Sequence, residues 1–225
     1  MYMSNSVAEL FVILALNPEK GRISLDSIHF RYSLTGALLM DYYDAGEFTV
    51  ENKRIIPAFR KNSDLLHDMI AERIMGSSKN RRISTWVSRL TNKSRFIFRE
   101  ITASLGKSQI LRIEQKKFLN IIPYKRYWFN DKSVRINLIE LLREILLYGK
   151  HPGKKEFMLL GLVEASRAYS LISRERGESK ILRKKNSELL SGEMIGAEIS
   201  QAIRDVQTAI MVSVTTAAFA AHSSH

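Results

Sequence analysis

The sequence predicts a mainly α-helical fold: a single-domain helical bundle with a buried central helix, surrounding amphipathic helices and two β-hairpins. Apolar residues recur at helical spacing through most of the 225-residue chain, and glycine or proline ends most of the segments so marked. Two short segments rich in β-branched and aromatic residues follow such endings. Because no polar linker divides the chain, we expect one domain over residues 1–225, with an ordered core from about residue 7 to residue 221.

The first part of the chain is expected to begin with two helices. An apolar run over residues 9–16 ends at Asn17-Pro18, because the residue before a proline avoids the α region. Ser33 is the expected N-cap of a second helix over residues 34–45. Gly46 follows at the position where glycine commonly ends a helix. These signals predict a pair of helices joined by a turn.

Turn residues divide the next stretch into a hairpin and three helices. Residues 47–56 predict the first hairpin, with its turn at Glu51-Asn52. Three helices follow, each after a residue that favours the N-cap position. The expected caps are Ser63 or Asp64 for the first helix, Ser84 for the second and Ser94 for the third. The helix from Ser94 is expected to run to about Leu105, where Gly106 ends it.

The second hairpin is expected over residues 110–121, with a basic turn at Lys116-Lys117 and an end at Pro123. Residues 113–118 match residues 50–55 in type at every position. The match suggests two helix-then-hairpin units, each with a basic turn. Convergent turn chemistry explains so short a match almost as well.

The remainder of the chain is expected to be helical. Four helices are predicted, over residues 132–148, 154–173, 184–190 and 193–221. Asp131 is the expected N-cap of the first. Residues 157–163 are apolar on every side, which indicates a buried helix. The last helix is rich in small residues that allow close packing, so we expect it near the centre of the bundle.

Positive charge concentrates between Lys93 and Trp128. This stretch holds nine basic and two acidic residues, a net charge of +7 against +12 for the whole chain, and six aromatic residues are interleaved with them. Such a density of cations and aromatic rings usually marks contact with a polyanion or a charged surface. A pI near 9.9 likewise indicates an anionic partner, which is nucleic acid, acidic lipid or an acidic protein.

No pattern in the sequence indicates an enzyme, a metal site or a cofactor. The chain has no cysteine, which excludes disulfides and cysteine-bound zinc and fits a reducing compartment. Its five histidines show no metal-ligand spacing, and no nucleophile elbow or phosphate-binding glycine loop is present. The first 16 residues lack the basic start of a signal peptide, and the uncharged segment 206–221 is too short to span a bilayer. We expect a cytoplasmic, non-enzymatic protein.

The main candidate site is an anion-binding face on the helix predicted from Ser94. Arg95 and Arg99 stand four residues apart and so share one face, near a helix end with free N–H groups and a positive dipole. A phosphate group would fit there, although a solvated basic face has the same pattern. Residues 124–129 combine aromatic rings with cations, which suits a lipid–water interface, base stacking or cover for the core.

Several segments, in order along nearly the whole chain, resemble the Golgi phosphoprotein family of peripheral proteins that bind phosphatidylinositol 4-phosphate. They are residues 9–16 (ELFVILAL), Gly21-Arg22, residues 34–39 (LTGALL), residues 86–90, residues 105–111 and the hairpin that follows. The resemblance implies one mostly helical domain, in which amphipathic helices surround a buried bundle and two β-hairpins are present. This agrees with the fold predicted from the residues themselves.

In that family the headgroup pocket uses a tryptophan and an arginine flanking the start of the second helix, and two arginines three residues apart before the second hairpin. Arg95 matches the first arginine of the latter pair, while Phe98 stands at the second, with Arg99 adjacent. Thr35 stands at the arginine of the second helix, and Asp26 near the tryptophan. The resemblance therefore implies binding to anionic phospholipid through charge more than through a shaped pocket.

The leading hypothesis is a peripheral membrane protein that binds phosphoinositide or another anionic phospholipid through Arg31, Arg95 and Arg99. In the family the second hairpin also serves membrane contact or self-association, possible here through Arg112, Lys116, Lys117 and Phe118. The alternative is nucleic-acid binding by the helix-then-hairpin units, with the helix from Ser94 in a groove. A scaffold that holds another protein through residues 124–129 is a third hypothesis.

Overall fold

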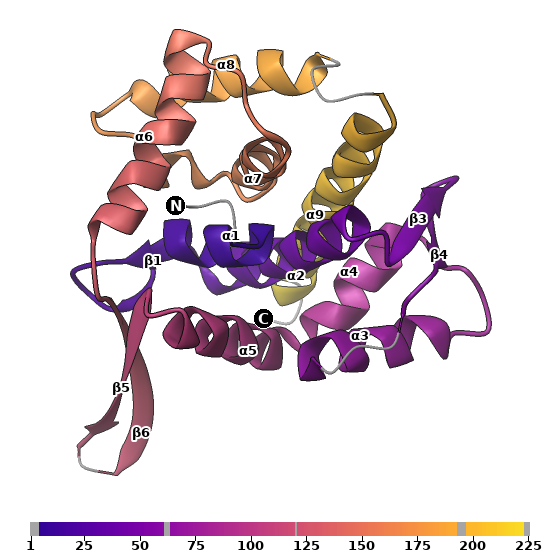
Figure 1. Cartoon of the computed structure of the whole chain (residues 1–225), viewed down its shortest axis with the longest axis horizontal. Coiled ribbons are helices and arrows are strands. Elements are labelled where there is room, and N and C mark those ends of the chain that lie inside the picture. The colour runs from indigo at the N-terminus through magenta and orange to yellow at the C-terminus, as the bar shows by residue number, and fades with distance from the viewer. Residues whose placement is uncertain (1–4, 61–63, 120, 193–196, 223–225) are drawn as a thin grey trace.

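The computed structural model describes residues 5–60, 64–119, 121–192 and 197–222 (Figure 1). Within these residues it has nine α-helices, a helix content of 62%, one short 3-10 helix and three two-stranded antiparallel sheets. The predicted fold class is confirmed. The third strand pair, which joins the first two helices, was not predicted.

The first half of the chain alternates helices with strand pairs. Its elements are α1 (Val7–Ala15), β1 (Leu16–Asn17), β2 (Arg22–Ile23), α2 (Ser27–Asp44), β3 (Phe48–Glu51), β4 (Arg54–Pro57), α3 (Leu65–Met75), α4 (Ile83–Thr91) and α5 (Ser94–Lys107). The second half begins with a long hairpin and continues as helices. Its elements are β5 (Leu111–Phe118), β6 (Ile122–Phe129), α6 (Ser133–Tyr148), α7 (Lys154–Ala165), the 3-10 helix η1 (Ala168–Leu171), α8 (Glu178–Ser191) and α9 (Ala197–His222).

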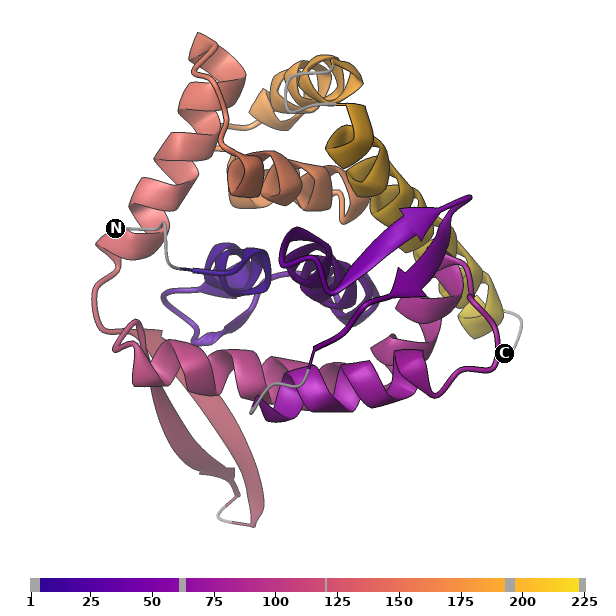
Figure 2. The ribbon, with the colours of Figure 1, turned by 45° about the vertical axis from the view of Figure 1, so that its right-hand side comes forward.

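Helix α1 lies at the centre of the bundle. Eight of its nine residues are buried, and only Glu9 is partly exposed. It packs against α2, α5, α6 and α7, and Figure 2 shows α1 and α2 between α7 on one side and α5 on the other. A helix that is apolar on every face is stable only when other elements enclose it. The surrounding helices and α1 therefore depend on one another.

The N-terminal end of α1 is held by a carboxylate from α2. Asp41 accepts hydrogen bonds from the backbone N–H groups of Val7 (2.6 Å) and Ala8 (2.9 Å). Ser6 and Glu9 form a reciprocal capping box beside it, in which each side chain accepts a bond from the other residue's backbone N–H. The N–H groups of the first turn, which have no acceptor within the helix, are thereby satisfied.

Helix α7 packs on α1 and α2 on the side opposite α5, and α9 packs on α2 and α7. Residues 157–163 of α7 are all buried, which confirms the prediction for this segment. Helix α9 packs on α2, α4 and α7 through one apolar face, formed by Ile203, Val206, Ile210 and Val214. Gly36 of α2 allows the close approach, because a Cβ there would overlap the side chain of Ile210. Outside this face α9 exposes Met211 and Phe219, so this helix lies at the edge of the bundle and not at its predicted centre.

Several predicted helix starts are wrong. Helix α2 begins earlier than expected, at Ser27, because the Asp26 carboxylate accepts hydrogen bonds from two N–H groups of its first turn. Three residues expected as N-caps lie inside helices instead, namely Ser33, Ser84 and Ser94. Apolar periodicity marks the buried part of a helix, and it fades where the first turn is exposed to solvent. Of the two caps expected for α3, Ser63 or Asp64, the structure has Asp64 at the N-cap, and Ser63 lies outside the described residues.

The second hairpin is longer than predicted and turns at a different place. Strands β5 and β6 pair over eight residues each, from Leu111 opposite Phe129 to Phe118 opposite Ile122. Lys116 and Lys117 therefore lie within β5, and the basic turn predicted there is wrong. Leu119 begins the true turn with a left-handed φ of 50°. The strands project from the bundle, so their exposed polar residues resemble a turn in the sequence (Figure 1).

The similarity between residues 50–55 and 113–118 is not structural. The first segment contains the turn of its hairpin, at Asn52-Lys53, where both residues have positive φ values of 49° and 61°. The second segment is a continuous part of β5. Pro123, expected to end the second hairpin, pairs with Lys117 inside β6. A helix precedes each hairpin, as predicted, but the two units do not share a turn.

The strand pair β1–β2 supports the base of the long hairpin. Gly21, in the turn between these strands, has a left-handed φ of 59°, a conformation that favours glycine. Its carbonyl accepts a hydrogen bond from the Tyr127 N–H at 3.0 Å. The Trp128 ring lies over Gly21, where a Cβ would come within 3.2 Å of it. The hairpin is thus fixed to the bundle at Gly21.

The C-terminal helices differ from the prediction in their bounds. Helix α7 ends at Ala165, not at Ser173, because Arg167 has a left-handed φ of 52° and η1 follows. Helix α8 begins at Glu178, well before the predicted start at Lys184. The Glu178 carboxylate pairs with Arg143 of α6 at 2.7 Å, which lowers the pKa of Glu178 to about 2. The predicted helix over residues 193–221 is confirmed as α9 from Ala197, while residues 193–196 lie outside the described residues.

Asp41→Asn should change how stability depends on pH. Burial raises the pKa of Asp41 to about 6, above its usual value near 3.8, although the N–H groups of Val7 and Ala8 act in the opposite direction. The folded protein then binds more protons than the unfolded chain between about pH 4 and pH 6, so this group lowers the free energy of unfolding as pH rises through that range. The loss is on the order of 3 kcal/mol. Asparagine cannot ionise and should abolish it.

Urea unfolding of both proteins at pH 4 and pH 7 provides the measurement. The stability of the wild type relative to Asp41→Asn should decrease from the lower to the higher pH. Asp205→Asn, on the surface of α9, is the matched control and should follow the wild type. Parallel behaviour of wild type and Asp41→Asn would contradict the assignment.

Candidate functional site

The N-terminus of α5 meets α2 and α4 through Arg31. The Arg31 Nε donates a hydrogen bond to the hydroxyl of Ser94 at 2.8 Å, and its Nη2 donates to the carbonyl of Thr91 at 3.3 Å. Ser94 is the first residue of α5 and Thr91 the last of α4. One guanidinium therefore ties the end of α4 to the start of α5. The sequence suggested Arg31 as a residue of this site but did not reveal its hydrogen bonds. Arg31 is about 60 residues away in the chain from Thr91 and Ser94, which accept them.

Arg95 extends from the first turn of α5 into solvent. Its side chain is exposed and makes no hydrogen bond or ion pair with any described residue. The first N–H groups of the helix have no acceptor within it, and Lys93, at the N-cap position, has no side-chain capping bond. Free N–H groups, the helix dipole and an unpaired guanidinium favour an anion at this end.

Arg99 lies on the same exposed side of α5 but is partly neutralised. Its guanidinium pairs with the adjacent Glu100 at 2.7 Å and stacks over the Phe96 ring, 4.7 Å from the ring centre. This ion pair is solvent-exposed and so contributes little energy. Arg99 can leave it for another anion, yet it adds less charge to the site than its sequence position suggested.

The other three pocket positions implied by the family resemblance have different surroundings. Thr35 is fully buried, with its hydroxyl bonded to the Arg31 carbonyl. Phe98 packs edge-on against Phe30 and Tyr127, at ring-centre distances of 5.5 and 5.1 Å. Asp26 caps α2 and pairs with a nearby histidine at 2.7 Å. None of the three places a cation at the site, so the basic face depends on Arg31, Arg95 and Arg99.

The cations of the hairpin gather around one carboxylate. Glu114 contacts the guanidinium of Arg112 at 2.9 Å and the ammonium of Lys116 at 3.6 Å, and it accepts a hydrogen bond from the Trp128 indole at 2.9 Å. These residues share one face of the ribbon, since alternate residues of a strand point the same way. Lys117 is exposed on β5. The side chain of Phe118, also predicted at this site, lies outside the described part of the chain.

The tip of the hairpin is apolar, which sequence reasoning missed. Leu119, Ile121 and Ile122 expose 76%, 79% and 59% of their surface. The nearest lysines lie further back along the strands. The available signal was the segment Leu119-Asn120-Ile121-Ile122, in which apolar residues surround a turn-forming asparagine. It was assigned to a strand because the turn was expected earlier.

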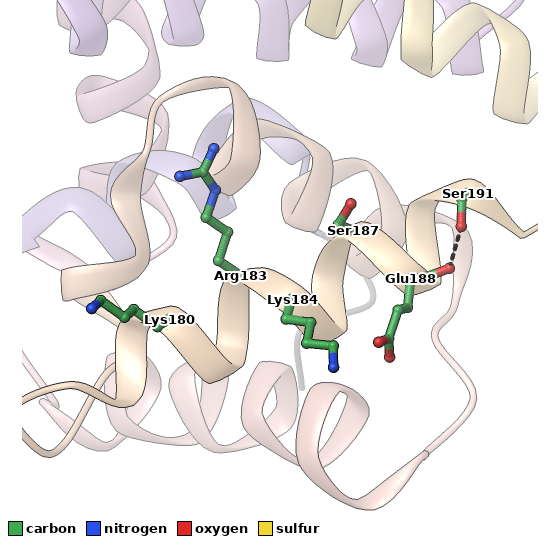
Figure 3. Close-up of a pocket in the computed structure, with 6 residues that line it drawn as sticks. All are labelled: Lys180, Arg183, Lys184, Ser187, Glu188 and Ser191. Atoms are coloured by element: carbon green, nitrogen blue, oxygen red, sulfur yellow. Dashed lines mark hydrogen bonds between the residues drawn. The ribbon is translucent and has the colours of Figure 1, made fainter.

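Two hollows elsewhere do not resemble an anion site. One, of about 640 Å3, lies between α1, α2, α3 and α5 and is lined by several carboxylates, Glu9, Asp41, Glu47, Asp64 and Glu100. The other, of about 600 Å3, lies along α8. Figure 3 shows that its cations, Lys180, Arg183 and Lys184, extend in different directions and do not converge. Figures 1 and 2 place α8 on the side opposite α5 and the hairpin.

The part of the chain that the structure describes has neither a metal-binding cluster nor a membrane-spanning helix. No group of three or more histidine, aspartate or glutamate side chains is arranged to hold a metal ion. No helix among these residues is both long and apolar enough to cross a bilayer.

Arg31→Ala should destabilise the protein by weakening the α4–α5 junction. The substitution removes donors from the buried hydroxyl of Ser94 and from the Thr91 carbonyl. Since Arg31 itself is exposed, we expect a loss of about 1–2 kcal/mol. Arg95→Ala is the matched control, because it removes the same charge from an unpaired side chain and should change stability by less than about 0.5 kcal/mol. Urea unfolding measures both. Equal losses would contradict the role assigned to Arg31.

Comparison with known proteins agrees with the resemblance seen in the sequence. The family model described as Golgi phosphoprotein 3 (GPP34) matches residues 7–206, which is most of the chain and extends from α1 into α9. A search of the curated proteins finds no match. The resemblance is therefore confirmed, and the chain belongs to the Golgi phosphoprotein 3 (GPP34) family.

Proposed function

We propose that this protein is a non-enzymatic peripheral membrane protein that binds anionic phospholipid through a basic face. The face is formed by Arg31, Arg95 and Arg99, and the hairpin projects from the same side of the molecule. The observation that most supports the proposal is the unpaired guanidinium of Arg95 at a helix N-terminus. Membership of the GPP34 family supports it independently, since members of that family bind phosphatidylinositol 4-phosphate.

Along the hairpin, apolar side chains at the tip are followed by lysines and aromatic rings, which is the order in which a bilayer presents its acyl and headgroup regions. The apolar tip suits the acyl region, while the lysines and aromatic rings behind the tip suit the headgroup region. Basic residues close to an anionic leaflet each contribute about 1 kcal/mol. In Figures 1 and 2 the ribbon points away from the bundle on the side that holds α5. Insertion of the tip would bring the basic face toward the headgroups.

Charge is expected to select the lipid more than headgroup shape does. Three of the four pocket positions of the family hold Asp26, Thr35 and Phe98, and none of these is a cation. We propose binding to anionic phospholipids in general, with phosphatidylinositol 4-phosphate as one ligand. The proposed location is the cytoplasmic surface of a membrane, and self-association through the hairpin is a further part of the proposal.

Nucleic-acid binding by α5 and the hairpin stays a prediction. Helix α5 buries Ile97, Ile101 and Leu105, and its exposed side offers arginines suited to phosphate groups. No retention of a random DNA duplex in a gel at low salt would exclude this alternative, whereas retention at physiological salt would favour it. The lipid proposal expects no retention at physiological salt.

Charge reversal at the basic face should reduce binding to anionic vesicles. For Arg95→Glu combined with Arg99→Glu, we expect co-flotation with phosphatidylcholine vesicles that contain phosphatidylserine to weaken at least about 30-fold, because the loss of two attractive charges costs about 2 kcal/mol and the new negative charges add repulsion. Vesicles with phosphatidylinositol 4-phosphate at equal surface charge test headgroup selection. Lys180→Glu combined with Lys184→Glu, on α8, is the matched control. Equal binding of the wild type to neutral and anionic vesicles at low salt, or no binding to either, would refute the proposal.

Removal of the apolar tip should weaken binding by a different route. We expect Leu119→Ser combined with Ile121→Ser to lower vesicle affinity by about tenfold, because two exposed side chains can no longer enter the acyl region. The salt dependence of binding should stay as in the wild type, since no charge changes. Leu65→Ser combined with Met75→Ser, which alters similarly exposed residues of α3, is the control. Unchanged affinity for the tip variant would exclude insertion of the hairpin.

A further inference from the structure

An apolar groove lies where α2, α7 and α9 meet. Its volume is about 450 Å3, and most of its lining is apolar or small, with two cationic or titratable groups, His29 and Arg167. The remaining lining residues are Ala165, Met211, Val214, Thr215 and Phe219. Apolar pockets of this size with a few polar groups are typical of small-molecule sites. Four of the lining residues belong to α9 beyond residue 206, outside the region that the family model matches.

The groove opens beside the proposed basic face. Helices α2 and α9 run antiparallel, since Gly36 lies against Ile210 while His29, nearer the start of α2, shares the groove with Phe219. Arg31, two residues after His29, contacts the start of α5. The first turns of α2 thus border the groove on one side and the basic face on the other. Figures 1 and 2 both show α9 running from the α8 side of the molecule to the α5 side.

The side chains of the groove are complementary to an amphiphile. Met211 and Phe219 expose 42% and 73% of their surface along the wall, where they cost free energy in water. Arg167 lines the groove with an exposed side chain and has a left-handed backbone, which is uncommon for residues other than glycine. The His29 ring is already bonded to Asp26. An anionic headgroup near Arg167 would pair with the cation, and a hydrocarbon chain along α9 would cover the exposed apolar side chains.

We infer that this groove accepts one acyl chain of an anionic membrane phospholipid. The inference rests on the proposed function, and it adds a second contact with the bilayer besides the hairpin. A partner helix suits the groove less well, because a helix about 10 Å across occupies roughly 420 Å3 per turn and only about one turn would fit. The guanidinium of Arg167 favours a headgroup with a net negative charge over a zwitterionic one.

Fluorescence quenching by lipid chains tests the inference directly. Phe219→Trp places an indole at the wall of the groove, and Tyr148→Trp, at the exposed end of α6, is the matched control. Vesicles of phosphatidylcholine and phosphatidylserine with brominated acyl chains are added to each variant and to the wild type, which supplies the background of its two tryptophans. We expect at least twofold more quenching for Phe219→Trp than for Tyr148→Trp. Equal quenching in vesicle-bound protein would overturn the inference.

A second measurement separates this inference from the proposed function. Met211→Ser combined with Phe219→Ser should weaken co-flotation with the same vesicles about tenfold and leave its salt dependence unchanged, whereas variants of the basic face should change the salt dependence. If wild-type protein floats with anionic vesicles but this double variant floats equally well, the groove is not a lipid contact and the proposed function stands. If wild-type protein does not float, both are refuted.

Discussion

The structure depends on the complete burial of one short helix. Helix α1 is apolar on every face except at Glu9, so it contributes to stability only if α2, α5, α6 and α7 enclose it. Burial of its N-terminal end requires acceptors for free N–H groups, and Asp41 of α2 and the Ser6–Glu9 box supply them. This requirement fixes α2 and α5 relative to each other. In this arrangement Arg31, near the start of α2, meets Ser94 at the start of α5.

The sequence predicted those parts of the fold that obey local rules. Periodic apolar residues located the helices. Gly46 and Gly149, which have positive φ angles, correctly marked the C-terminal ends of α2 and α6. The helix start at Asp26 was missed because the first turn of α2 is partly exposed and lacks apolar periodicity, and the start at Arg82 was missed because Ser84, a better capping residue type, follows it. The second hairpin was misplaced for a similar reason. Both faces of a ribbon that projects into solvent can be polar, so its strands carried no alternation to fix their register.

The candidate site was predicted as a set of residues but not as an arrangement. Arg95 and Arg99 were found because their spacing is local to one helix. The bonds of Arg31 to Ser94 and Thr91, and the neutralisation of Arg99 by Glu100, are properties of side-chain geometry that spacing does not specify. The apolar tip and the groove at Phe219 each combine residues whose exposure depends on packing elsewhere. Exposed apolar surface is therefore what the sequence revealed least.

The lysines and the proline of the β5–β6 hairpin oppose aggregation of the protein when it is not bound to a membrane. An isolated two-stranded ribbon has two edges with unpaired backbone groups, to which a strand of another chain can add. Pro123 removes one donor from the outer part of β6, and Lys116, Lys117 and Lys125 place like charges along the ribbon. Strands of further copies that add edge to edge would meet repulsion, whereas the proposed self-association of the hairpin does not require its edges to pair. An apolar tip can thus be displayed in water on a ribbon that resists growth into a fibril.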